Sequence, residues 1–143
     1  MDSILLLNAY ITIFMFSVIL MTQIVSYPLL KNVDNINFLK YHNFYVNRIF
    51  IIVAPAMFFE FILSFYILYY FNSFYVLINF LTIALIFLST ALIQVPIHEK
   101  LKHSKDNFLI HRLINTNWIR TILWTTKLVI SNKILLKEIL WIL

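Results

Sequence analysis

Residues 4–25 read ILLLNAYITIFMFSVILMTQIV, a run of 22 residues without a single Asp, Glu, Lys or Arg. An α-helix needs about 20 predominantly apolar residues to cross the roughly 30 Å hydrocarbon core of a bilayer. The run ends at Tyr27-Pro28. This stretch therefore predicts one membrane-spanning helix.

Two similar runs follow in the first two thirds of the chain. Residues 49–71 are apolar except for Glu60, and residues 74–95 form an uncharged run that Pro96 closes. Only a short polar turn separates these two runs, so they are expected to be antiparallel neighbours.

A weaker fourth run covers residues 113–130 and contains Arg120 and Lys127. The tail, residues 131–143, has amphipathic spacing and either lies in the membrane interface or prolongs the fourth helix. We therefore predict an all-α fold, an integral membrane four-helix bundle that forms one domain over residues 1–143.

The composition supports this class of protein. Hydrophobic residues make up 62% of the chain and charged residues 12%, whereas a soluble domain averages roughly 45–50% and 25%. Membrane lipid is the expected partner. Nucleic acid is not, because the net charge of +5 comes from basic residues that form no stripe. The absence of Cys and Gly excludes thiolate chemistry and a Gly-rich phosphate loop. Since the first charge, Asp2, is acidic, no cleaved signal peptide is expected.

The basic residues also predict an orientation in the plasma (inner) membrane. Seven Lys and Arg residues fall in residues 28–48 and 96–112, and only Lys133 and Lys137 fall on the opposite side. Loops rich in Lys and Arg stay in the cytoplasm. Both termini are therefore expected outside. The helical spacing within residues 38–45 predicts that part of the first loop lies along the interface.

Arg120 and Lys127 make the fourth helix marginal in lipid. A central Lys or Arg costs about 2.5–3.5 kcal/mol for insertion, and each Leu, Ile or Val returns only about 0.3–0.6. We expect this helix to depend on the other three. Its Arg120 is expected to face inward, toward Glu60 or Gln94.

Polar groups inside a membrane are expensive, so each one is a candidate site residue. Four residues of the fourth helix fall on one stripe at 3.6 residues per turn: Asn117, Arg120, Trp124 and Lys127. All of them except Lys127, together with residues of the other helices, predict a polar pocket near the cytoplasmic interface. The predicted catalytic residues are His42, His98, Asn117 and Arg120. The predicted ligand-binding residues are Gln23, Arg48, Glu60, Gln94 and Trp124.

Glu60 and the histidines allow more than one interpretation. Glu60 is a structural ion pair or hydrogen-bonded carboxyl between helices two and four, or it handles protons or binds a metal. The histidine spacing matches no zinc or di-iron motif, so no metal and no cofactor are predicted. A metal site of His42, His98 and Glu60 remains the alternative. His103 and His111 are expected to be solvated.

The stretch Gln94-Val95-Pro96-Ile97-His98-Glu99-Lys100-Leu101, followed by Asn117-Trp118-Ile119-Arg120-Thr121, resembles the anthrone-oxygenase-like family of small four-span membrane proteins. That family has a polar-x-Pro-x-polar-x-x-Leu motif at the end of helix three and Asn-x-x-Arg-Thr at the start of helix four. The chain departs from it at His98, usually Asn, and at Trp124, where small residues are common. The resemblance implies a four-helix bundle and, for a few members, oxygenation of an aromatic polyketide without an obvious metal.

These observations predict a membrane protein that binds a small lipophilic molecule. The resemblance implies an oxidation there, with Arg120 and Asn117 stabilising an enolate-like anion and His42 or His98 acting as acid and base. The alternative is a non-enzymatic accessory subunit or small carrier in which the same residues only hold the bundle together. The oligomeric state is left open.

Overall fold

The computed structural model describes the backbone of residues 2–71 and 73–140. The described chain is helical apart from short connections. In chain order its elements are α1 (Asp2–Met21), η1 (Thr22–Ser26), α2 (Tyr27–Asn32), α3 (Phe38–Tyr70), α4 (Phe74–Ser89), η2 (Thr90–Gln94), α5 (Val95–Leu101) and α6 (Asn107–Leu140).

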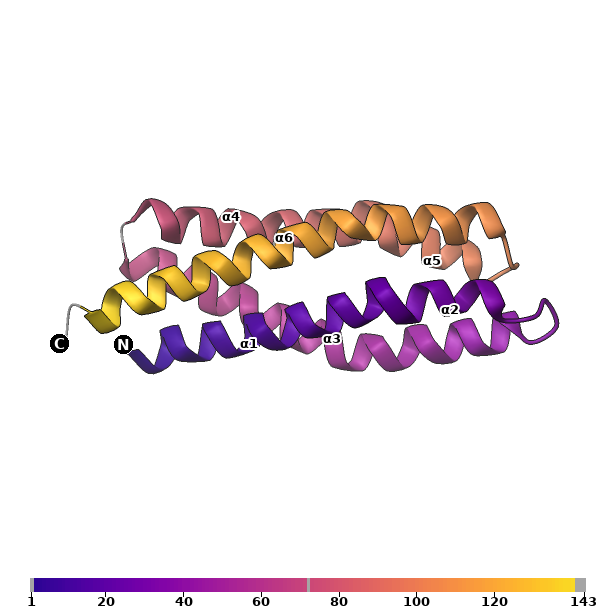
Figure 1. The fold of residues 1–143 in the computed structure, drawn as a ribbon, viewed down its shortest axis with the longest axis horizontal. Coiled ribbons are helices and arrows are strands. Elements are labelled where there is room, and N and C mark those ends of the chain that lie inside the picture. The colour runs from indigo at the N-terminus through magenta and orange to yellow at the C-terminus, as the bar shows by residue number, and fades with distance from the viewer. Residues whose placement is uncertain (1, 72, 141–143) are drawn as a thin grey trace.

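These elements form four long segments of one elongated bundle (Figure 1). The first segment is α1, η1 and α2 in continuous sequence, the second is α3, the third is α4, η2 and α5, and the fourth is α6. The start of α1, the end of α3, the start of α4 and the end of α6 lie at one end of the bundle, which we call the end with the chain termini. The connections at residues 33–37 and 102–106 lie at the other, which we call the loop end.

Polar side chains fix the starts of two helices. The Ser73 hydroxyl accepts a hydrogen bond from the Val76 amide at the start of α4. Asp106 lies just before α6, and its carboxylate accepts hydrogen bonds from the amides of Phe108 and Leu109 at 2.8 and 3.2 Å. Such caps satisfy amides that have no partner within the helix.

The first and third segments each contain one π-helical turn of five residues, η1 and η2. A proline follows two residues after each turn, Pro28 after η1 and Pro96 after η2. A π-helical turn is a local widening of a helix and is frequent at functional sites. Both turns face the cavity described below.

The bundle buries polar groups and exposes apolar ones. Asn8, Glu60 and Lys127 are fully or almost fully buried, whereas Phe50 and Leu92 are each 67% exposed. A soluble protein distributes its residues the other way round. Three stretches are long and apolar enough to cross a membrane, with mean hydropathies of 2.2–2.5: Ser3–Asn32, Phe38–Tyr70 and Phe74–Leu101. The chain is thus an all-α membrane bundle of four long helical segments.

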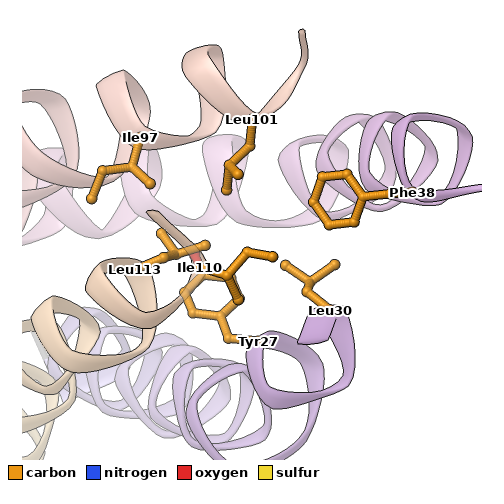
Figure 2. Close-up of a cluster of buried hydrophobic side chains, with 7 residues drawn as sticks. All are labelled: Tyr27, Leu30, Phe38, Ile97, Leu101, Ile110 and Leu113. Atoms are coloured by element: carbon orange, nitrogen blue, oxygen red, sulfur yellow. The ribbon is translucent and has the colours of Figure 1, made fainter. Parts of the chain in front are cut away.

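Three apolar clusters hold the segments together along the bundle. The cluster at the loop end joins α2, α3, α5 and α6 through Tyr27, Leu30, Phe38, Ile97, Leu101, Ile110 and Leu113. Figure 2 shows these side chains pointing toward one another from separate helices. The middle cluster is built around Trp124, with Met15, Ile19, Met57, Ile83 and Ile86. The cluster near the chain ends contains Leu5, Ile67, Val76 and Ile134.

Several helices extend beyond the predicted spans. The predicted boundaries 4–25, 49–71, 74–95 and 113–130 mark the apolar runs, but the helices continue past them into the loop end. The prediction that residues 38–45 lie along the interface is wrong, because they form the first turns of the continuous helix α3, with Phe38 and His42 buried. Part of the predicted tail prolongs α6 to Leu140, and residues 141–143 lie outside the described residues.

Candidate functional site

A chain of three aromatic polar side chains crosses the interior near the loop end. The Tyr27 hydroxyl lies 3.0 Å from Nε2 of His98, and Nδ1 of His98 lies 3.1 Å from Nε2 of His42. His42 is fully buried and stacks on Phe38, with ring centroids 5.5 Å apart. Because each imidazole has one donor and one acceptor when neutral, the hydrogen bonds can run in either direction along the chain. The structure thus brings the two predicted histidines together from α3 and α5.

Amide side chains hold Arg120 one layer deeper. The Asn117 amide donates to Oε1 of Gln23 at 2.9 Å, and Asn117 Oδ1 accepts from Nη1 of Arg120 at 3.3 Å. The Gln23 amide donates to the Ile114 carbonyl at 3.2 Å. The Gln94 amide reaches the Thr116 carbonyl at 3.4 Å. The two predicted glutamines therefore both fasten their helices to α6.

Arg120 has no acidic partner among the described residues. Its side chain is 6% exposed, and its Nε is buried without a hydrogen-bond partner. A buried charge costs several kcal/mol unless an opposite charge and hydrogen bonds compensate it. Arg120 is inward-facing, as predicted.

Arg120 lies on the wall of a cavity of about 370 Å³. The polar part of the wall consists of Thr22, Tyr27, Tyr45, Asn47, Thr90, Gln94, His98, Glu99, Lys102 and Arg120. The apolar part consists of Met15, Val18, Ile19, Val46, Ile49, Phe50, Val53 and Val95. A small-molecule site typically combines a largely apolar lining with a few convergent polar groups in about 300–1,000 Å³. The cavity has this character.

A second polar centre lies nearer the chain ends. The Lys127 ammonium is 3.1 Å from Oε1 of Glu60, with both side chains fully buried. Lys127 also donates to Ser64 at 2.9 Å and to Asn79 at 2.8 Å. Glu60 accepts further hydrogen bonds from Asn8 and Thr12. This network joins α1, α3, α4 and α6.

The prediction that Arg120 faces Glu60 is therefore wrong, because Lys127 occupies that position. Arg120 does line the same cavity as Gln94, although no hydrogen bond joins their side chains. The apolar cluster around Trp124 separates the cavity from the second centre.

Sequence reasoning missed most of the second centre. Its unpredicted members are Asn8, Thr12, Ser64, Asn79 and Ser131, and each is buried. A signal was present, since Asn8/Thr12, Glu60/Ser64 and Lys127/Ser131 are all four residues apart. Residues at this spacing share one helix face, so three helices each carry a two-residue polar stripe at a similar depth.

Not all predicted site residues meet at the cavity. Gln94, His98 and Arg120 line it, while His42 contacts His98, Asn117 accepts from Arg120 and Gln23 accepts from Asn117. Arg48 is exposed, with its guanidinium 5.3 Å from the Phe44 ring. Trp124 and Glu60 belong to the deeper layers.

A metal site of His42, His98 and Glu60 is not assembled, because Glu60 lies in the second centre. Within residues 2–71 and 73–140, no group of three or more His, Cys, Asp or Glu side chains is arranged to hold a metal ion. His103 and His111 are exposed.

Comparisons with known protein families, with curated proteins and with solved structures give no match for this chain.

Proposed function

We propose that this chain is a membrane protein that binds a small lipophilic molecule in the cavity beside Arg120. The observation that carries the proposal is the cavity itself, whose lining combines apolar side chains with several polar ones within a bundle of four helices. Hydrocarbon or ring atoms fit the wall of Met15, Ile19 and Val53. Hydrogen-bonding atoms fit the wall formed by Arg120 and His98.

Hydrogen bonds hold the polar side chains of the site. Arg120 donates to Asn117, which Gln23 holds in turn, and Tyr27 and His42 contact His98 at its two ring nitrogens. Polar groups that are held in place before the ligand arrives lose little entropy on binding, which favours affinity and a defined ligand orientation.

Small molecules released from the purified protein test this proposal. We expect mass spectrometry to find a lipophilic compound that co-purifies in mild detergent. Val53→Trp fills the cavity and should abolish its retention. Ile52→Trp is the matched control, because Ile52 is 48% exposed on the outer face and does not line the cavity. Equal retention by both variants would place the compound on the lipid-facing surface instead. The absence of any bound compound, with no stabilisation by added lipophilic compounds, would contradict the proposal.

A second candidate function is an oxidation in the same cavity, as the family resemblance implies. It is favoured by the presence of an imidazole and a guanidinium, from His98 and Arg120, on one cavity wall. His98 would take a proton from the CH₂ carbon of an anthrone, which is conjugated with the carbonyl through the aromatic rings, and Arg120 would hold the resulting enolate-like oxygen. For an anthrone with dioxygen, the CH₂ group becomes C=O and the second oxygen atom leaves as water.

Oxygen uptake separates the two candidates. With an anthrone supplied in vesicles, uptake that His98→Gln and Arg120→Gln each abolish would support oxidation. Binding without uptake would leave a non-enzymatic carrier or accessory protein.

A further inference from the structure

We infer that the ligand of this cavity is an anionic amphiphile that enters sideways from the membrane, between α3 and α5, and places its anionic group against Arg120. This inference rests on the proposed binding function and adds the charge of the ligand and its route.

The negative charge of the ligand is inferred from the partners of the acidic side chains. Glu60 is paired with Lys127, and Glu99 at the cavity wall is paired with Lys102. The two remaining described carboxylates serve the connections: Asp34 accepts from Asn37, and Asp106 caps α6. No described carboxylate is therefore left for Arg120, whose Nη1 donates to the neutral Asn117.

The cavity wall thus carries an excess positive charge. It contains the cations of Arg120 and Lys102 but only the carboxylate of Glu99. A carboxylate, phenolate or phosphate monoester on the ligand would supply the missing partner, and guanidinium binds such groups through two parallel hydrogen bonds. The buried, unpartnered Nε of Arg120 is a donor available for one of them.

The route follows from which cavity residues are exposed. Residues contributed by α1, α2 and α6 are buried or half-buried, whereas the exposed ones are Asn47 and Phe50 of α3 and Val95 and Glu99 of α5. The cavity therefore opens to the outside of the bundle between α3 and α5.

The opening lies where a membrane amphiphile carries its polar group. Phe50 is 20 residues before the end of α3 at Tyr70, which corresponds to about 30 Å of helix, the thickness of the hydrocarbon core. Val95 lies at a corresponding distance from the start of α4. Phe50 and Val95 thus form the apolar part of the rim. Asn47, Glu99 and Lys102 form its polar part.

A matched pair of probes tests the charge. The full-length protein is placed in nanodiscs of phosphatidylcholine, which has no net charge, and titrated with dodecanoate or with 1-dodecanol, which has the same chain and no charge. Binding is measured by native mass spectrometry and by the rise in unfolding temperature. We expect dodecanoate to bind at least about tenfold more tightly than 1-dodecanol.

Two pairs of variants complete the experiment. Arg120→Gln should abolish the preference for dodecanoate, whereas Arg48→Gln, which removes an exposed arginine outside the cavity, should leave it unchanged. Phe50→Trp with Val95→Trp at the rim should slow the rise of the bound fraction, followed by native mass spectrometry over time, whereas Phe58→Trp on the outer face of α3 should not. Folding of each variant is checked by its cooperative unfolding.

Three other outcomes would contradict the inference, each for a different reason. Equal binding of the two probes, unaffected by Arg120→Gln, would retain the binding function and contradict the anionic class. Inorganic phosphate that competes at the same concentration as dodecanoate would assign the site to a water-soluble anion. Failure of both probes to bind would contradict the inference together with the binding function.

Discussion

The Glu60 carboxylate and the Lys127 ammonium lie 3.1 Å apart, and neither side chain is exposed. This ion pair joins α3 to α6, and its hydrogen bonds to Asn8 and Asn79 extend it to α1 and α4. The pair gives Lys127 an acidic partner inside the membrane. Residues 113–130, the apolar run around Lys127, contain no Asp or Glu.

Removing one member of this pair should destabilise the bundle strongly. Glu60→Leu or Lys127→Met leaves an uncompensated buried charge, which typically costs about 3–5 kcal/mol. The double variant should recover much of this loss, because neither charge then remains. Thermal unfolding in detergent measures the effect. Lys137→Met is the control, since Lys137 is an exposed cation on the same helix. Additive losses in the double variant would show that the two side chains are not energetically coupled.

The amide pair of Gln23 and Asn117 gives a second stability prediction. Asn117→Leu removes the donor to Gln23 and the acceptor for Arg120, so the free energy of unfolding should fall by about 1–3 kcal/mol. Asn115→Leu is the control, because Asn115 is exposed on the same helix. If both variants unfold at the same temperature, the buried amides contribute no more than the exposed one.

The Tyr27 hydroxyl should matter for binding more than for folding. Tyr27→Phe removes one hydrogen bond to His98 and one polar atom from the cavity wall, with an expected loss of about 1 kcal/mol in stability. The affinity for the co-purified compound should fall as well. Tyr41→Phe, on an exposed tyrosine, should change neither quantity. A co-purified compound retained equally by both variants would exclude the hydroxyl from the binding wall.

The orientation in the membrane is open to a direct test. Reporters inserted after Phe71 and fused to the C-terminus should both report an extracytoplasmic position, because Lys and Arg concentrate in the opposite connections. A reporter inserted at residues 102–106 should report the cytoplasm. The reverse pattern would place the cavity opening at the outer leaflet.

The four helical segments could be predicted because each apolar run is close to the length that a bilayer requires. Their true ends could not, because the helices at the loop end continue past the hydrocarbon layer into regions with polar and charged residues. There Phe38, Ile97 and Leu101 bury one face in a small core of their own. A protruding helix is stabilised by this packing, which hydropathy along the chain does not reveal.

Contacts between buried polar side chains could be predicted within one helix but not between two helices. The 3.6-residue period placed Asn117 and Arg120 on the same face of α6, and the structure joins them. Of the two predicted partners of Arg120, Glu60 and Gln94, Glu60 is wrong, because a sequence gives neither the rotation nor the relative height of two helices. Lys127 lies two turns further along α6, at the level of Glu60.

The two π-helical turns have a consequence for how this chain tolerates change. Each takes up one extra residue within a membrane helix, and in a regular α-helix that residue would rotate everything after it by about 100°. Tyr27 and His98 both follow such a turn, and their side chains meet at 3.0 Å. Deletion of a single codon within Thr22–Ser26 would convert the turn into regular α-helix and leave Tyr27 facing His98, whereas a single deletion within α1 would rotate Tyr27 by about 100° relative to the residues before the deletion. The two turns are thus places where the chain can lose a residue without separating these two side chains.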